Sequence, residues 1–380
     1  MGTRCVHAGE RGHTDKGAVC VPIYHSSSFH TPSLLALEQA RSGERPFYSR
    51  YGNPTVEALE EKVADLEGAP AGVAFSSGMG AISTTLLSLL HPGERVIASL
   101  GLYGGTTHLL QEVLAPLGIE VVTFSDLAQL RVLGREGASV LYLESPINPT
   151  LRLVDLSAAA KAVPKATVVV DNTFATPINQ RPLELGAHVV VHSATKYLGG
   201  HSDLLAGVAV GDRRRMKAIR ERRKLLGPML DPMTAFLALR GLKTLHLRME
   251  RHNASAAAVA KEIEGARGIR AVSYPGLRSH PQHRLAARQM DGYGGIVTLT
   301  LRDLRAVERF VARLRVITHA ATVAGHETLA TIPALTSHWN LPPARLAAEG
   351  VKSGMVRISI GLEEPADLVA DLRQALAANR

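Results

Sequence analysis

One lysine stands in a setting that suits covalent chemistry with a carbonyl group. Lys196 lies in the segment His192-Ser193-Ala194-Thr195-Lys196-Tyr197-Leu198-Gly199-Gly200-His201, which follows the apolar run 189–191. A lysine amine forms a Schiff base with an aldehyde or ketone, and burial or neighbouring cations lower its pKa. The flanking hydroxyl groups and glycines suit a ligand site, but a solvated loop lysine fits this segment alone equally well.

Two further segments could complete a site around that amine. Asp171 ends the apolar run 168–170, and a carboxylate there can point into a ligand crevice and keep a ring nitrogen protonated. The alternative is a helix cap or a turn residue. Ser76-Ser77-Gly78-Met79-Gly80 lies between a short apolar run and a helical pattern, where free N–H groups and the helix dipole favour a phosphate. It is not a dinucleotide fingerprint, because Ser83 replaces the third glycine.

Six short β-branched runs predict the strands that position these residues, and helical patterns such as 84–90 and 156–163 lie between them. Strands that are apolar throughout are buried on both faces, so the alternation predicts an α/β fold with a mostly parallel sheet. In such sheets ligands bind beyond the carboxyl ends of the strands. The runs are 95–98, 121–124, 140–143, 168–170, 189–191 and 207–210.

The flanking regions have different patterns. Residues 1–50 show little periodicity and are predicted to form an extended N-terminal arm. A helix then follows, with Asn53 as its cap and Gly68 at its end. The pattern places one large domain at 51–245 and a smaller one at 246–380.

The C-terminal part predicts a smaller α+β domain. A long helix is predicted from Asp231 towards Ile263, followed by alternating strands at 295–301 and 355–361. In the last strand Arg357 lies on the face opposite Val356 and Ile358, so it can point into a cleft while the apolar residues fill the core.

The composition excludes several classes of protein. Hydrophobic residues make up 46% and charged residues 20%, as in globular domains. Cys5 and Cys20 are the only cysteines, which excludes a disulfide scaffold and suits a reducing cytoplasm. Ala330 stands where a zinc motif starting at His326 needs a second histidine, so no metal site is predicted. No apolar run approaches the ~20 residues that span a bilayer, so no membrane partner is expected.

The excess of basic residues leaves one alternative open. The net charge is +9, and eight Lys or Arg residues lie between Asp212 and Lys224. Such a run could bind nucleic acid, although it is more often the solvated face of a helix. Aromatic residues are only 4%, which gives little support for a base-stacking surface. We therefore predict no nucleic-acid partner, and nucleic-acid binding by this run remains an alternative function of a different kind.

Eight segments spread over almost the whole chain form one ordered set: 48–55, 76–79, 102–106, 144–149, 171–174, 193–196, 240–245 and 357–363. Together they resemble the cystathionine γ-synthase/γ-lyase family, the pyridoxal phosphate (PLP)-dependent enzymes of Cys and Met metabolism with fold type I. The resemblance implies a mostly parallel, seven-stranded type of sheet with helices on both faces, a smaller C-terminal α+β domain, and pyridoxal 5′-phosphate as cofactor.

The resemblance also implies a role for each site residue. Lys196 binds the cofactor covalently and moves protons, Asp171 pairs with the pyridine nitrogen, and Tyr103 stacks on the ring and assists at the leaving group. Further cofactor contacts come from Ser77, Gly78, Met79, Asn148, Ser193 and Thr195. Tyr48 and Arg50 are expected to hold the phosphate of a neighbouring subunit. Arg357 clamps the substrate carboxylate by a two-pronged hydrogen bond, and Thr322 and Asn148 contact the substrate.

The implied activity is γ-elimination or γ-replacement on a sulfur amino acid. A carbon–sulfur lyase resembling cystathionine γ-lyase or methionine γ-lyase is favoured, and a cystathionine γ-synthase or O-acylhomoserine sulfhydrylase is the alternative. Neither lyase pattern is complete: Gly105 replaces the Cys usual in methionine γ-lyases, and Ala321–Ala324 departs from the cystathionine γ-lyase pattern. The shared phosphate site implies a homo-oligomer, and the family usually forms a tetramer of two active dimers.

Overall fold

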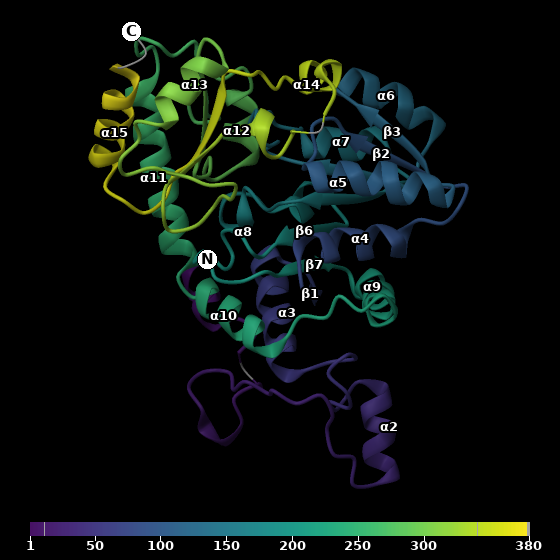
Figure 1. Cartoon of the computed structure of the whole chain (residues 1–380). Helices are drawn as coiled ribbons and strands as arrows, with labels where there is room; N and C mark the ends of the chain where they lie inside the picture. The colour runs from purple at the N-terminus through teal and green to yellow at the C-terminus, as the bar shows by residue number, and fades with distance from the viewer. Residues whose placement is uncertain (11, 340, 378–380) are drawn as a thin grey trace.

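Two β-sheets organise the chain in the computed structural model, which describes residues 1–10, 12–339 and 341–377 (Figure 1). The larger sheet has seven strands in the order β1-β7-β6-β5-β4-β2-β3, and the smaller sheet has five in the order β10-β11-β12-β9-β8. The α/β fold class is therefore confirmed. The domain boundaries after residues 50 and 245 stay a prediction.

All six predicted strands form in the larger sheet. Neighbours from β2 to β6 run parallel, whereas β7 is antiparallel to both β6 and β1. The carboxyl ends of β4, β5 and β6 therefore meet at one edge. The strands are β1 (Ala71–Phe75), β2 (Arg95–Ser99), β3 (Glu120–Phe124), β4 (Val140–Glu144), β5 (Thr167–Asp171), β6 (Val189–Ser193) and β7 (Gly207–Gly211).

Helices cover both faces of this sheet. Successive residues of β6 belong to different cores: Val190 packs with α3 on one face, and Val191 packs with α4 on the other. As predicted, Asn53 caps α3 by accepting from the N–H of Thr55 at 3.1 Å, and Gly68 ends it at φ 76°. The helices are α3 (Pro54–Glu67), α4 (Gly78–Leu89), α5 (Gly104–His108), α6 (Leu127–Glu136), α7 (Leu156–Ala162), α8 (Thr176–Asn179) and α9 (Arg213–Leu226).

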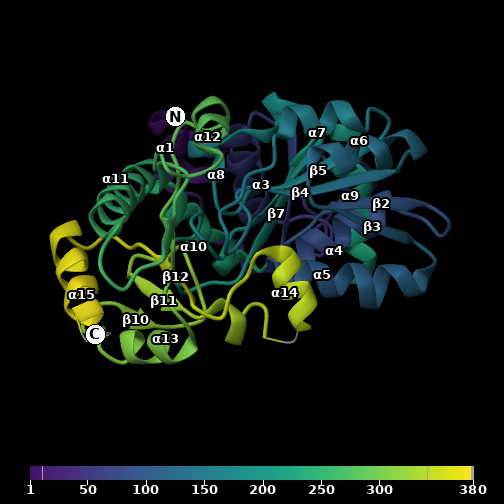
Figure 2. The same cartoon turned by 90° about the horizontal axis from the view of Figure 1, so that it is seen from above.

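The C-terminal region builds the smaller sheet around a core of its own, and Figure 2 shows it beside the larger sheet. Val297, Leu299, Val356 and Ile358 pack there against α11 and α15. Its strands are β8 (Ala271–Ser273), β9 (Ile296–Thr300), β10 (Thr318–His319), β11 (Leu329–Thr331) and β12 (Met355–Ser359). Its helices are α12 (His283–Gln289), α13 (Leu304–Val311), α14 (Pro343–Glu349) and α15 (Pro365–Ala377).

The long helix predicted from Asp231 towards Ile263 is two helices, α10 (Pro232–Leu242) and α11 (Leu245–Ile263). At the break, Arg248 donates to the carbonyl oxygen of Gly241 at 2.7 Å, so that carbonyl does not need a helical partner. A side chain at Gly241 would also lie 2.3 Å from the carbonyl oxygen of Gly199, so the two segments touch there through backbone alone. The contact with Gly199 is long-range, and the contact with Arg248 is made by a polar side chain seven residues away, so hydrophobic periodicity did not predict the break.

An extended N-terminal arm was predicted, but the arm contains two short helices. α1 (Gly2–His7) buries Cys5 against α3, and α2 (Leu34–Ser42) begins at Ser33, whose hydroxyl accepts from the N–H of Ala36 at 3.1 Å. Packing of Cys5 therefore accompanies α1, whereas a local cap starts α2 where the hydrophobic pattern is weak. Figure 1 shows α2 projecting away from both sheets.

The basic run forms α9 and is partly neutralised within the chain. Arg220 and Arg223 both bind the buried Glu60, at 2.6 and 2.8 Å. In the part of the chain that the structure describes, no helix combines the length and apolar character needed to cross a membrane.

Candidate active site

One cavity of about 590 Å³ opens at the carboxyl ends of β4, β5 and β6, where the parallel sheet predicts a ligand site. The larger sheet supplies one wall, and the C-terminal region supplies Thr322 and Arg357. All the predicted site residues except Tyr48 and Arg50 line it: Ser77, Gly78, Met79, Tyr103, Asn148, Asp171, Ser193, Thr195, Lys196, Thr322 and Arg357. The fold thus brings together residues as far apart in the chain as Ser77 and Arg357.

The amine of Lys196 lies within this cavity. Its Nζ donates to Thr322 Oγ1 at 3.0 Å, which joins the two regions of the chain at the reacting position. Burial lowers the pKa of Lys196, and the positive charge of Arg357 lowers it further. Both effects favour the neutral amine, which is the form that attacks a carbonyl carbon and accepts a proton.

An anion site lies at the start of α4. Ser77 caps this helix by accepting from the N–H of Gly80 at 3.0 Å, and the N–H groups of Gly78 and Met79 at the helix start can serve a ligand. A side chain at Gly78 would lie 2.7 Å from Cβ of Ser193, so only glycine lets the helix start approach β6 this closely. The hydroxyl group of Ser193 lies beside Gly78 and completes a cradle that fits a phosphate. Thr195 also lines the cavity, with its hydroxyl group bonded to the backbone of Ala206.

Two carboxylates lie side by side at the strand ends. Glu144 and Asp171 are paired in the parallel register of β4 and β5, and both are buried. Burial raises the pKa of Glu144 to about 8, and the charge of Asp171 adds to this shift. Burial also raises the pKa of Asp171, but hydrogen bonds from Thr173 and the charge of His192 oppose it. Glu144 is therefore a group that holds a proton at neutral pH, whereas the contacts of Asp171 with Thr173 and His192 favour its charged form.

Arg357 presents a guanidinium with donors to spare. Nη1 donates to Asn148 Oδ1 at 2.9 Å, and Nη2 donates to Thr331 Oγ1 at 3.3 Å. Nε has no partner among the described residues. Burial lowers the pKa of Arg357 to about 10, so the group is still charged at neutral pH. A carboxylate in the cavity would satisfy these donors and the charge together.

Tyr48 and Arg50 lie outside the cavity of their own chain. Arg50 donates to the carbonyl oxygen of Lys224 at 3.2 Å and lies over the ring of Tyr51, 4.9 Å from its centroid. The ring of Tyr48 is half-exposed on the same arm. Their predicted action on a neighbouring subunit stays a prediction.

Several residues of the cavity were not predicted from the sequence. Glu144 accepts from the N–H of Tyr103 at 2.8 Å and so helps to place that ring, and its position at a strand end next to Asp171 was the available signal. The outer part of the cavity has exposed apolar side chains from two loops: Leu205, Leu335 and Trp339. No periodic pattern marks those loops.

The donor set fits one kind of organic group. An anion fits the start of α4, a protonated ring nitrogen fits the Asp171 carboxylate, an aromatic face fits Tyr103, and a carbonyl fits Lys196. A cavity of about 590 Å³ has room for such a group and an amino acid. Within the described ranges, no cluster of His, Cys, Asp and Glu side chains that could hold a metal ion is found.

Comparisons with known proteins show the family to which this chain is similar. The model of the family "Cys/Met metabolism PLP-dependent enzyme" matches residues 2–377. L-methionine gamma-lyase of Pseudomonas deceptionensis is 42% identical, covering 99% of this chain and 97% of its own. Cystathionine beta-lyase of Lactococcus lactis subsp. cremoris is also 42% identical, over 98% of each chain. The crystal structure of cystathionine gamma synthase from Xanthomonas oryzae pv. oryzae in complex with cystathionine has a TM-score of 0.94 at 37% identity, covering 100% of this chain and 98% of its own.

Proposed function

The chain belongs to the Cys/Met metabolism PLP-dependent enzymes, and from that membership we propose that it is a carbon–sulfur lyase for an L-amino acid with an uncharged thioether side chain, such as methionine. Its class of activity is that of its relatives, PLP-dependent lyase or synthase chemistry on sulfur amino acids. A β-lyase among the relatives adds a reaction that the sequence analysis did not include.

The distribution of charge along the cavity carries this proposal. The charged residues that line it, Glu144, Asp171, Lys196 and Arg357, belong to its deep end, and three of them are buried. The mouth includes the apolar side chains of Leu205, Leu335 and Trp339, which are 67%, 54% and 69% exposed. Thr336 and Ser337, which are polar but uncharged, lie beside them in the lining. A second amino-acid group, as in cystathionine, would bring two charges to this mouth, where no charged partner occurs among the described lining residues. An S-alkyl group would gain apolar contact instead.

Each side chain has a proposed part in the reaction. Bound PLP supplies an electron sink for the charge that develops at Cα. Arg357 binds the substrate carboxylate and so orients the Cα proton towards Lys196, whose neutral amine accepts it. Asp171 would hold a proton on the ring nitrogen, and Tyr103 would stack on the ring. For a γ-elimination a Cβ proton must also be removed; Tyr103 would then donate a proton to the departing sulfur, so that a thiol leaves and hydrolysis gives 2-oxobutanoate and ammonia.

A substrate panel tests the proposal. We expect purified holoenzyme to release 2-oxobutanoate and ammonia from L-methionine without added thiol, with kcat/KM about tenfold above that for cystathionine, since one apolar contact in place of an unpaired charge is worth ~1.4 kcal/mol or more. Product from O-succinylhomoserine only when a thiol is added would show a synthase instead. Pyruvate from cystathionine as the main product would show a β-lyase.

We further propose that the active unit is a homo-oligomer, a dimer or a tetramer of two dimers, in the cytoplasm. Support comes from the arm, where Tyr48 and Arg50 lie exposed and outside their own cavity. Mixing an Arg50→Ala variant with a Lys196→Ala variant should restore part of the activity, because a hybrid dimer then has one complete site. No recovery after subunit exchange would contradict the shared site.

A further inference from the structure

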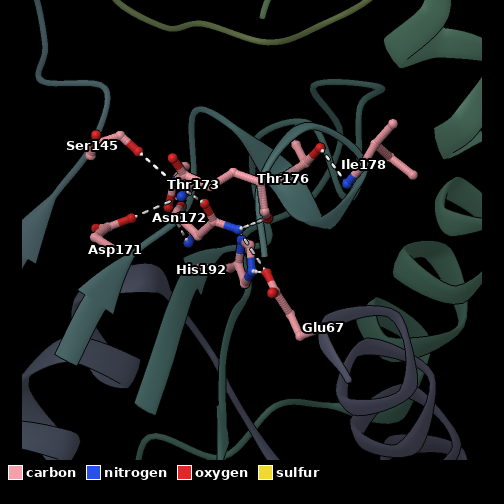
Figure 3. A network of polar contacts seen from close by, with 10 residues as sticks. Glu67, Ser145, Asp171, Asn172, Thr173, Thr176, Ile178 and His192 are labelled. Atoms are coloured by element: carbon pink, nitrogen blue, oxygen red, sulfur yellow. Dashed lines mark hydrogen bonds and ion pairs between the residues drawn. The ribbon is translucent and has the colours of Figure 1, made fainter. Parts of the chain in front are cut away.

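A buried glutamate–histidine pair lies behind the strand that carries Asp171 (Figure 3). Nε2 of His192, in β6, is 2.6 Å from Oε1 of Glu67, the last residue of α3. Neither side chain has any exposed surface. Neither residue lines the cavity, so the proposed reaction leaves this pair without a role.

The pair is joined directly to the residue after Asp171. Asn172 Nδ2 donates to the same oxygen of Glu67 at 2.8 Å and to the carbonyl oxygen of Gln180 at 2.9 Å. Gln180 Nε2 in turn donates to Asn172 Oδ1 at 3.0 Å. The side chain of Asn172 is thereby held at both its nitrogen and its oxygen, and the backbone that carries Asp171 cannot shift without breaking these bonds.

The two faces of the sheet separate the anchor from the site. Val190 of β6 packs on the α3 face and Val191 on the α4 face, so His192 returns to the α3 face, where Glu67 lies. Asp171, paired in register with Val191, points to the other face and into the cavity. The Glu67–His192 pair therefore acts on Asp171 from the opposite side of one sheet.

Packing alone does not account for this pair. Removing two charges from water costs several kcal/mol per ion, and apolar side chains of similar volume often serve a fold equally well. Here the penalty is not fully offset, because Oε2 of Glu67 and Nδ1 of His192 find no hydrogen-bond partner within the described residues. A pair of this kind is better explained by what it does to its neighbour.

We propose that Glu67 and His192 are positioning residues, which hold Asp171 against the cofactor's ring nitrogen and keep its carboxylate charged. Glu67 binds His192 at 2.6 Å, and the charge of His192 acts on Asp171 through the sheet. This effect favours the charged carboxylate of Asp171, because burial raises the pKa of Asp171 and the charge of His192 opposes the rise. This inference rests on the proposed role of Asp171 towards PLP.

Two near-isosteric variants test the inference, Glu67→Gln and His192→Gln. Each keeps the shape of the contact but removes its charge. In holoenzyme loaded with PLP labelled at the ring nitrogen, nitrogen NMR should show this nitrogen protonated in the wild type and less protonated in both variants. The dissociation constant of PLP should rise about tenfold, the effect of one outer hydrogen-bond partner on a bound group. The double variant should be no worse than the more affected single variant, because the two residues act as a unit.

Glu60→Gln is the matched control. It removes another buried carboxylate from α3, one bound by Arg220 and Arg223, and should lower the melting temperature without moving the nitrogen signal. Wild-type signals and PLP affinity in both test variants, or an equal change in the control, would overturn the inference. A nitrogen signal that Asp171→Asn leaves unchanged would instead remove the proposed role of Asp171, and with it this anchor.

Discussion

The deep end and the mouth of the cavity are built in different ways. The deep end consists of strand ends and a helix start. Asp171 is buried there and accepts from the N–H of Thr173, and Arg357 is buried and donates to Asn148 and Thr331. The mouth consists of loop residues, and Trp339 there is 69% exposed. Groups that must be placed accurately for chemistry lie on rigid elements, whereas loops can vary the substrate without disturbing them.

The deep end also concentrates unfavourable electrostatics. The pKa values of Glu144 and Asp171 are raised by burial, and that of Lys196 is lowered. Such perturbed groups cluster where a site needs them for proton transfer. The comparison therefore implies that substitutions at the deep end affect catalysis, and that those at the mouth affect the choice of substrate.

Replacing Lys196 should have the largest effect. Lys196→Ala removes the amine that accepts the Cα proton, so kcat should fall by about 10³-fold or more while the fold persists. Borohydride reduction followed by peptide mass mapping should find the cofactor on residue 196 of the wild type and nowhere in the variant. Lys217→Ala, on the exposed side of α9, is the control and should keep full activity. Turnover at the wild-type rate in Lys196→Ala would refute the assignment.

Arg357→Lys should have the next largest effect. Lysine keeps the charge but cannot make the two-pronged contact, and a charged hydrogen bond lost in a buried site costs about 2–3 kcal/mol. KM for L-methionine should therefore rise about 30–100-fold, with a smaller change in kcat. Inhibition by the corresponding amine without a carboxylate should be unchanged. An equal loss of affinity for that amine would show that Arg357 acts on the shape of the cavity rather than on the carboxylate.

At the mouth, Trp339→Ala should lower kcat/KM for L-methionine about tenfold through the loss of ~1.4 kcal/mol of apolar contact. The affinity for PLP should not change, because the cofactor contacts lie at the deep end. Leu225→Ala removes a similarly exposed apolar side chain outside the cavity and should change neither quantity. A loss of PLP affinity in Trp339→Ala would break the division between the two ends.

The difference between the deep end and the mouth also explains which residues could be predicted from the sequence. Lys196, Asp171 and Gly78 follow from local patterns, a strand end or a helix start, and these patterns also place them at one edge of a parallel sheet. Glu144 needed the strand register, which pairs it with Asp171. Trp339 lies in a loop without periodicity, so its place at the mouth depends on tertiary structure alone.

Long-range contacts explain the remaining differences. The break between α10 and α11 depends on Arg248, which reaches the carbonyl oxygen of Gly241 and that of Tyr197, the residue after Lys196. The hydrogen bond from Lys196 to Thr322 joins residues 126 positions apart. A single sequence read for hydrophobic periodicity contains no signal for such pairs.

The smallest predicted effect concerns the support of the deep end. His252 packs against the ring of Tyr197 at 5.1 Å between centroids, and its Nδ1 lies 2.8 Å from the carbonyl oxygen of Ile360. Burial lowers the pKa of His252 to about 4, below its ordinary value of 6.5. The unfolded chain therefore binds a proton on this residue at a higher pH than the folded chain does. The contribution of His252 to the unfolding free energy is therefore fully present well above pH 6.5 and is lost as the pH drops towards 4.

When the pH is lowered from about 7 to about 5.5, the protonation of His252 in the unfolded chain should lower the unfolding free energy by about 1 kcal/mol. Urea denaturation at each pH measures this change. His252→Asn keeps a donor for the carbonyl of Ile360 but cannot be protonated, so its stability should fall less over the same range. His319→Asn, at an exposed histidine in β10, should retain the wild-type slope. An identical slope in His252→Asn would mean that the support of Lys196 does not depend on a neutral imidazole, and that the deep end tolerates charge better than its burial implies.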